Sequence, residues 1–266
     1  MTTVSYRTFT GTAAENYERH FVPKIATPVS ATLLETAALR AGERVLDVAC
    51  GTGVIARLAA ERVGPSGTVT GLDLSPEMID HARGVSPPTV EWHVGDAESL
   101  PFADGAFDVV LCQMGLMFMQ DRPAAVAEMR RVTAAGGRVV VNTPGVEPAG
   151  FTLMGQALVE HIDAELGGFV HAVFSMHDPE EVGSLLGNAG LVDVTAATPS
   201  ATLHLGAPAE FLWQYINLTP MAPFVAQASA TAQEAMERQV VESWRPFTRD
   251  GTMSIDLPVV VGSGRR

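Results

Sequence analysis

Short apolar runs alternate with helix-like segments through the middle of the chain. Five runs rich in β-branched residues are expected to form strands, at residues 44–49, 68–73, 89–94, 107–112 and 137–142. The amphipathic segments between them are expected to form helices, at residues 54–63, 76–83 and 122–133. Alternation of this kind is typical of a parallel sheet with helices on both faces. The pattern therefore predicts a doubly wound α/β fold.

The flanking regions are less regular. Upstream, helical spacing is found at residues 13–21, where the helix is expected to end before Pro23, and at residues 27–39. Downstream, helices are expected at residues 178–189, 208–218 and 230–244. Residues 192–197 and 202–205 are expected as a bent sixth strand or a hairpin, and residues 253–261 as the last strand. The helices between these strands predict an insertion on the sheet and no independent second domain.

Composition narrows the classes of partner. The 266 residues carry a formal charge of −13, and Lys24 is the only lysine. This balance argues against a nucleic-acid backbone or an anionic membrane surface, because both require a positive footprint. Cys50 and Cys112 lack zinc spacing, so two reduced cysteines and no metal are expected. The polar residues 1–10 contain no apolar signal core, and residues 109–119 are too short for a membrane span, which needs about 20 residues. A soluble cytoplasmic protein is expected.

The most informative segment is residues 45–53, where an apolar strand runs into a Gly-rich turn and then a helix. Gly51 and Gly53 allow the backbone to turn and to approach a ligand closely. A dinucleotide-binding turn would have a third glycine where this chain has Ala56. Asp47 approaches the same turn, and a carboxylate there suits a ligand with an ammonium group better than one with two phosphates.

Two further acidic positions follow the next strands. Asp73 ends the second strand, where a carboxylate can accept hydrogen bonds from both ribose hydroxyls of an adenosine cofactor. The alternative is a helix cap, but Ser75 is better placed for that role. Asp96 follows the third strand and could accept the amine of adenine, or it could be an ordinary loop residue. Gln113 ends the fourth strand at the rim where such sheets bind ligands.

These segments together resemble the class I S-adenosylmethionine-dependent methyltransferases, and within them the ubiquinone/menaquinone-biosynthesis C-methyltransferases and their small-molecule relatives. The resemblance covers residues 17–142, with Ala49 standing where many members have glycine. It rests on five motifs in order: VLDVACGTG, GLDLSPEMI, GDAESLPF, FDVVLCQMGLMFM and AAGGRVVV. It implies a Rossmann-like, seven-stranded methyltransferase sheet with an N-terminal cap helix. The implied layout is one domain, with cap helices in 1–40, a cofactor-binding core in 41–144, a substrate cover in 145–252, and the last strand and tail in 253–266.

The resemblance also implies the cofactor, S-adenosylmethionine, and a role for each motif residue. The methionine part would be held by Asp47 and by the backbone at Ala49, Gly51 and Gly53. Asp73 would bind the ribose, and Gln113 would lie beside the sulfonium. The adenine would be lined by Leu74 and Met78, with Asp96 and Ala97 at its edge.

The acceptor is expected to be a small, largely apolar molecule, neutral or weakly charged. The chain lacks the (Asp/Asn)-Pro-Pro-aromatic loop of enzymes that methylate nucleic-acid bases, and its charge is negative. Oxygen or carbon is favoured over nitrogen by the resemblance alone. Side chains that suit an apolar substrate are Met114, Met117, Phe118, Phe169, Phe174, Phe211, Trp213, Tyr215 and Met221. Each could equally be part of the ordinary core.

Three residues are candidates for catalysis. Tyr17 in the N-terminal helix would close over cofactor and substrate, as such helices do in similar enzymes. His20 follows it by three positions, and His171 lies in a Gly-rich stretch expected to form a mobile pocket wall. His177 is expected at the surface. A lone histidine is more often structural, so the identity of a general base, if one is used, stays open.

Three other functions compete with methyl transfer. One is a cyclase or rearrangement enzyme that keeps the cofactor for structural reasons, and another is a non-catalytic partner of a methyltransferase. An NAD-dependent oxidoreductase is the weakest, because the glycine spacing is wrong. The sequence leaves open the acceptor, the regiochemistry and the oligomeric state, with a homodimer among the alternatives.

Overall fold

A computed structural model describes residues 12–266, and their contacts separate them into two units. The core unit consists of Val29–Gly145, Met176–Pro199 and Val259–Arg266. The accessory unit consists of the described residues up to Pro28, Val146–Ser175 and Ser200–Pro258. The polar segment 1–10, which the sequence predicts to lack a secretory signal, lies outside the described residues.

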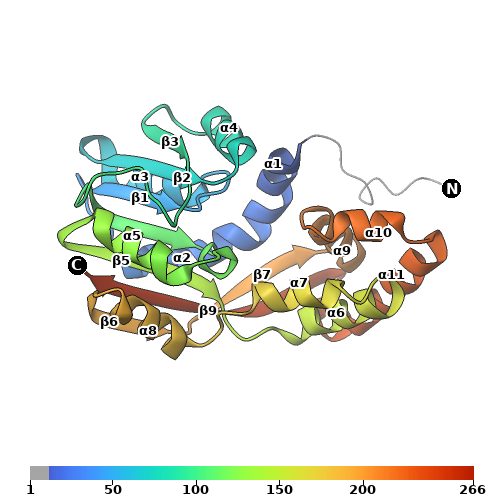
Figure 1. The fold of residues 1–266 in the computed structure, drawn as a ribbon. Helices are drawn as coiled ribbons and strands as arrows, with labels where there is room; N and C mark the ends of the chain where they lie inside the picture. Colours follow the sequence, from blue (N-terminus) through green and yellow to red (C-terminus); the bar gives the residue numbers. More distant parts are fainter. Residues whose placement is uncertain (1–11) are drawn as a thin grey trace. The chain divides into compact units, whose positions relative to one another are not determined.

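The core unit contains one mixed sheet in the strand order β3-β2-β1-β4-β5-β9-β6 (Figure 1). The five strands from β3 to β5 are parallel, β9 is antiparallel to β5, and β6 is antiparallel to β9. The order reverses direction at β1, so β1 and β4 flank the switch point where doubly wound sheets bind ligands. The strands are β1 Arg44–Val48, β2 Thr68–Asp73, β3 Val90–Val94, β4 Phe107–Gln113, β5 Thr133–Pro144, β6 Val192–Ala197 and β9 Thr252–Arg265. The predicted fold class is confirmed.

The helices of the core unit lie where the hydrophobic pattern predicts them. They are α2 Thr27–Ala37, of which the first two residues belong to the accessory unit, α3 Val54–Val63, α4 Pro76–Val85, α5 Arg122–Val132 and α8 Pro179–Asn188, with short 3-10 turns η2 Gly64–Ser66 and η3 Leu116–Phe118. Helix α4 begins as expected, because the Ser75 hydroxyl accepts the backbone N–H of Met78 at 3.4 Å. One face of the sheet is covered by α5 and α8, whose Met129 and Leu186 pack into a buried cluster with Leu46 and Val110.

The accessory unit is mainly helical. Its helices are α1 Ala13–Asn16, the π-helix η1 Tyr17–Ala26, α6 Ala149–His161, α7 Leu166–Val173, α9 Pro208–Asn217, α10 Ala222–Gln227, α11 Ala230–Ser243 and the 3-10 turn η4 Arg245–Phe247. Strands β7 Ser200–Gly206 and β8 Thr248–Arg249 pair with residues 252–258 of β9. The unit has an aromatic core in which Phe151 contacts Phe174, Phe211 and Tyr215.

One predicted boundary is wrong for an identifiable reason, and one pair of alternatives is decided. The first helix does not end before Pro23, because it continues through this residue as a π-helix to Ala26. In a π-helix the N–H of each residue bonds five positions back, as that of Thr27 does with Val22, and this spacing relieves the clash of the proline ring with the carbonyl four positions earlier. For residues 192–197 and 202–205 the structure agrees with the bent strand and not with the hairpin, because β6 and β7 pair in turn with successive parts of β9 and not with each other.

Three helices were not predicted. Helices α6, α7 and α10 are rich in glycine, proline or unpatterned apolar residues, so they lack a clear polar face in the sequence. Gly167 and Gly168, expected in a mobile wall, lie within α7. In the described part of the chain, no helix is both long and apolar enough to cross a membrane.

Candidate functional site

The backbone after β1 turns through three left-handed residues. Ala49, Gly51 and Gly53 have φ values of 56°, 54° and 86°. The turn closes with the N–H of Gly53 bonded to the carbonyl of Cys50 at 2.9 Å, and α3 begins at the next residue. Gly53 carries no side chain that could cap α3, and the first turn of the helix begins beside the carboxyl end of β1. This is the place where doubly wound sheets bind their cofactor.

Asp47 is the buried carboxylate of this turn. Only 1% of the residue is exposed, and its Oδ2 accepts the backbone N–H of Ala56 at 3.0 Å. Burial raises the pKa of Asp47 to about 8, and the nearby charge of Asp73 raises it further, against the opposing effects of the Ala56 N–H and Arg57. A cation beside Asp47 would favour the ionised form. The site therefore fits the ammonium group of the methionine part of S-adenosylmethionine.

Asp73 connects the end of β2 to the Gly-rich turn. Its Oδ2 accepts the N–H of Gly51 at 2.8 Å, and its Oδ1 accepts the N–H of Ser75 at 2.9 Å. Each carboxylate oxygen can accept more than one hydrogen bond, so the predicted ribose contacts are compatible with these two. The residue is partly buried. Asp73 thus shapes the turn, a role the sequence alone did not indicate.

The predicted adenine-lining residues differ in exposure. Leu74 is 70% exposed, so its side chain is accessible to a ligand, although a single exposed leucine is common at protein surfaces. Met78 is partly buried on the first turn of α4. Asp96 is exposed and its Oδ1 accepts the N–H of Glu98 at 2.9 Å, while Ala97 is buried in the cluster beneath. All the predicted cofactor residues lie in the core unit, at or just beyond the carboxyl ends of β1 to β4.

The end of β4 is held by a buried asparagine of β5. Gln113 is partly buried and pairs in register with Asn142. Met114 has a φ of 49°, and its N–H donates to Oδ1 of Asn142 at 3.0 Å. Asn142 is fully buried, and its Nδ2 donates to the carbonyl of Val29 at 3.4 Å. Asn142 was not among the predicted site residues, although a polar residue directly after three valines was a usable signal.

Trp92 is a second residue of the site that was not predicted from the sequence. It lies on β3 opposite Gly71 of β2, and only 9% of it is exposed. A Cβ atom built on Gly53 would lie 2.2 Å from Cη2 of Trp92, and one built on Gly71 would lie 2.4 Å from Cζ3. The indole therefore occupies the space that both glycines leave and supports the Gly-rich turn. A glycine inside a buried strand next to a strand with tryptophan was the available signal.

The predicted substrate residues are divided between the units. Met117 is buried and Phe118 is 57% exposed in η3 of the core unit, next to Met114. The others lie in the accessory unit, where Phe174, Phe211 and Tyr215 surround Phe151; the remaining three are Phe169, Trp213 and Met221. Burial raises the pKa of the Tyr215 phenol, so it is neutral at ordinary pH.

The three catalytic candidates all lie in the accessory unit. Tyr17 stacks on Phe21 with ring centroids 4.6 Å apart. His20 is partly buried, and its pKa is lowered by burial and by the charges of Lys24 and Arg19. His171 is exposed on α7, so it lies on a helix and not in the mobile wall that was expected. His177 is exposed, as expected.

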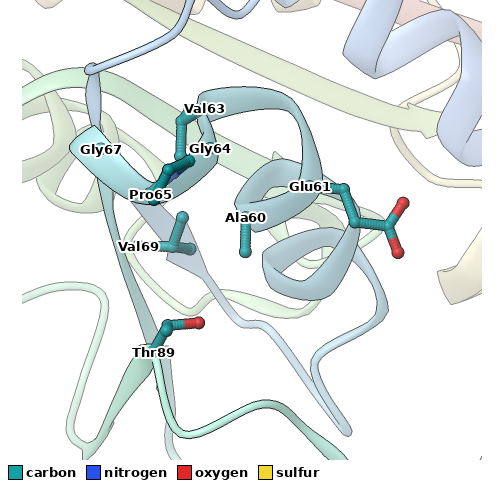
Figure 2. Close-up of a pocket in the computed structure, with 8 residues that line it drawn as sticks. All are labelled: Ala60, Glu61, Val63, Gly64, Pro65, Gly67, Val69 and Thr89. Carbon is teal, nitrogen blue, oxygen red and sulfur yellow. The ribbon is translucent and has the colours of Figure 1, made fainter.

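A separate pocket lies at the opposite edge of the core sheet. It has a volume of about 340 Å³ and is lined by the end of α3, by η2, by Val69 near the start of β2 and by Thr89 just before β3 (Figure 2). The only charged residue drawn, Glu61, directs its carboxylate away from Val69 and Thr89 in this view. Ligands of such sheets bind at the carboxyl ends of the strands, so this pocket is no candidate for the cofactor.

Residues 45–137 match the family model described as "Methyltransferase domain". Nocamycin O-methyltransferase of Saccharothrix syringae is 30% identical over 260 residues, which cover 90% of each chain. The ubiquinone/menaquinone biosynthesis C-methyltransferase UbiE of Burkholderia orbicola is 43% identical over 109 residues, 39% of this chain and 44% of that enzyme. The matched segment of this chain spans less than half of the length of the first curated relatives, from 33% to 44%.

Solved structures agree on the fold. Phosphoethanolamine N-methyltransferase 2 of Haemonchus contortus in complex with S-adenosyl-L-methionine superposes with a TM-score of 0.60 at 18% identity, covering 100% of this chain and 60% of that one. Identity this low shows the fold alone. The full-length similarity to the nocamycin enzyme, the matched domain and the geometry of the turn around Asp47 and Asp73 have one explanation. The chain belongs to the class I S-adenosylmethionine-dependent methyltransferases.

Proposed function

We propose that the protein transfers a methyl group from S-adenosylmethionine to oxygen or carbon of a small, largely apolar molecule. The observation that carries the proposal is the pair of carboxylates around the Gly-rich turn, a buried Asp47 and an Asp73 hydrogen-bonded to Gly51. The cofactor supplies a sulfonium whose methyl group is electrophilic. The relatives named as O- and C-methyltransferases support the choice of acceptor atoms.

The protein residues contribute by positioning. Asp47 holds the ammonium group and Asp73 the ribose hydroxyls, while the left-handed backbone at Ala49, Gly51 and Gly53 allows close approach of the ligand. Asn142 fixes the backbone of Met114 beside Gln113, where we place the sulfonium. Where the acceptor is a hydroxyl, a base must also remove its proton.

His20 is the strongest candidate for that base, with Tyr17 and His171 as alternatives. Its lowered pKa keeps the imidazole neutral near pH 7, and only the neutral ring can accept a proton. His20→Gln should then reduce kcat and remove an ionisation from the pH profile of kcat, while KM for the cofactor stays unchanged. Tyr17→Phe and His171→Gln are the matched tests of the alternatives.

Two measurements test the proposal. Calorimetry should show that the folded protein binds S-adenosylhomocysteine, and Asp73→Ala should weaken this binding. Incubation with S-adenosylmethionine labelled at the methyl group should transfer label to a molecule in the small-molecule fraction of an extract. Absence of binding would overturn the proposal. Binding without transfer of label would favour a cyclase or rearrangement enzyme, and recovery of a partner with turnover only in the complex would favour a non-catalytic role.

The proposal also covers the class of partner, the oligomeric state and the cellular location of the protein. The charge of −13 and the missing base-methylating loop support a small molecule over nucleic acid. Electrophoretic shift with single- and double-stranded RNA and DNA at low salt tests this, and light scattering distinguishes a homodimer from a monomer. Fractionation of the cells that produce the protein tests the cytoplasmic location.

A further inference from the structure

Lys24 occupies an unusual position in the accessory unit. It is the only lysine in a chain of charge −13, and it follows Pro23 in the π-helix η1. The residue is partly buried, although lysine side chains are ordinarily exposed. π-Helical segments occur frequently at functional sites, because they displace side chains from the ordinary helical positions. These features identify Lys24 as a residue whose charge needs an explanation.

The ammonium group is held by a neutral side chain. Nζ of Lys24 donates to Oε1 of Gln214 at 2.6 Å, and Nε2 of Gln214 donates to Oε1 of Glu210 at 2.7 Å. Gln214 is only 4% exposed, so its amide is fixed with the oxygen toward Lys24 and the nitrogen toward Glu210. The amide stands between the cation and the carboxylate and keeps them from forming a direct ion pair.

The charge of Lys24 is therefore incompletely compensated. Among the residues that the structure describes, Gln214 is the hydrogen-bond partner of Nζ, and an ammonium has three N–H donors. Burial lowers the pKa of Lys24, and the more distant charge of Glu210 opposes this effect. His20 on the same helix offers no negative charge. Gly206, at the end of β7, leaves room near the ammonium, because a Cβ there would lie 3.6 Å from Nζ.

We propose that Lys24, positioned by Gln214 and Glu210, is an anion-binding residue that takes an ionised oxygen of a small organic acid. A partly desolvated ammonium without a carboxylate partner gains charge-assisted hydrogen bonds when an anion arrives. The chain's other cations are arginines, so this compact ammonium is unique in the molecule. The methyl acceptor is then itself an acid, a carboxylate or a phenolate, and this part of the inference rests on the proposed function.

The single lysine makes the test direct. In protein labelled with ¹⁵N at the lysine side chain, all ¹⁵Nζ signal comes from Lys24. Benzoate and 4-nitrophenolate should each shift this signal in a saturable way if the site takes both kinds of oxygen, and a response to one alone identifies the acid class. The neutral molecules benzamide and nitrobenzene should not shift it. The proposal would be overturned if neither anion shifted the ¹⁵Nζ signal, or if neutral and anionic probes shifted it equally. It would also be overturned if inorganic phosphate shifted the signal at a lower concentration than either organic anion.

Matched variants separate charge from packing. Lys24→Met should weaken binding of the responding anion by about tenfold or more in calorimetry. Gln214→Glu keeps the shape but gives Lys24 its own carboxylate, so it should weaken binding similarly, whereas Arg249→Met removes an exposed charge of the same unit and should have no effect. Unchanged binding in Lys24→Met and Gln214→Glu would contradict the proposal. All variants should bind S-adenosylhomocysteine normally; if the wild type does not bind it, the proposed function fails independently of the anion site.

Discussion

The backbone N–H of Gly51 donates a hydrogen bond to the carboxylate of Asp73 over 2.8 Å. This contact ties the turn after β1 to the end of β2, two adjacent parallel strands. Asp73 therefore has a structural role in the ligand-free protein besides the ribose binding that we propose. Any substitution of Asp73 changes both, so its effect on binding has to be separated from its effect on the turn.

Asp73→Ala should weaken binding of S-adenosylhomocysteine by about 1–3 kcal/mol, because hydrogen bonds to a carboxylate are lost. Calorimetry with S-adenosylhomocysteine and with its 2′-deoxy analogue separates ribose binding by Asp73 from its support of the turn. The wild type should bind the analogue more weakly than the product, and Asp73→Ala should bind the two equally. Asp80→Asn, on an exposed face of α4, is the control. If the variant still discriminates between the two ligands, Asp73 does not bind the ribose.

The stability of the ligand-free protein should depend on Asp47. The unfolded carboxyl releases its proton near its ordinary pKa of 3.8, whereas the folded one retains it up to about pH 8. Between these values the folded state binds more protons, so the free energy of unfolding should fall as the pH rises through this window. Asp47→Asn should flatten that fall. Urea unfolding at a series of pH values measures it, and equal slopes for the two proteins would contradict the shifted pKa.

The same carboxyl should make cofactor binding depend on pH. An ammonium beside Asp47 favours ionisation, so binding releases a proton and the affinity for S-adenosylhomocysteine should rise from about pH 6 toward pH 8. In Asp47→Asn the affinity should be lower and nearly independent of pH over this range. Calorimetry in buffers of different ionisation enthalpy detects the released proton directly. A wild-type affinity that is constant with pH would place the ammonium elsewhere.

The hydrophobic pattern predicts the sheet of the core unit well, because its strands are buried and each is bounded by a turn. Strand β2 and helix α3 begin and end where expected. The accessory unit is predicted only in part: α9 and α11 end within one residue of the expected bounds, whereas α6, α7 and α10 were not predicted. Residues such as Phe151 are buried by other helices of this unit, and helices covered on several sides lack the polar stripe that sequence reasoning requires.

The residues of the candidate site were also predicted only in part. Asp47 and Asp73 were found from sequence because a motif places them at strand ends. Trp92, Asn142 and the Lys24–Gln214 contact were not, since each acts on a residue far away in the chain, as Gln214 does 190 positions from Lys24. Contacts of this kind are set by the tertiary fold. The sequence marks such residues only by their unusual type, a sole lysine or a polar residue after an apolar run.

The support of the Gly-rich turn by Trp92 predicts a ranked series of alanine variants. Gly64 has a φ of 65° and a ψ of −170°, a conformation that essentially only glycine adopts, and no atom lies within 4 Å of an added Cβ, so Gly64→Ala should cost the backbone strain alone, about 1–3 kcal/mol. Gly71→Ala adds a clash with Trp92 at an unstrained backbone, and Gly53→Ala combines a φ of 86° with the closest clash. The loss of unfolding free energy should therefore be larger for Gly53→Ala than for Gly71→Ala, and that of Gly64→Ala measures strain without a clash.

A second background identifies the tryptophan as the cause of the larger losses. In Trp92→Leu, Gly71→Ala and Gly53→Ala should each cost less than in the wild type, because the smaller side chain leaves room for the added methyl group. The cost of Gly64→Ala should be the same in both backgrounds. Trp92→Leu alone should also weaken S-adenosylhomocysteine binding, since the turn loses its support while every predicted ligand contact remains. If the glycine costs do not change with Trp92, or if Trp92→Leu binds the ligand as the wild type does, the indole does not position the turn.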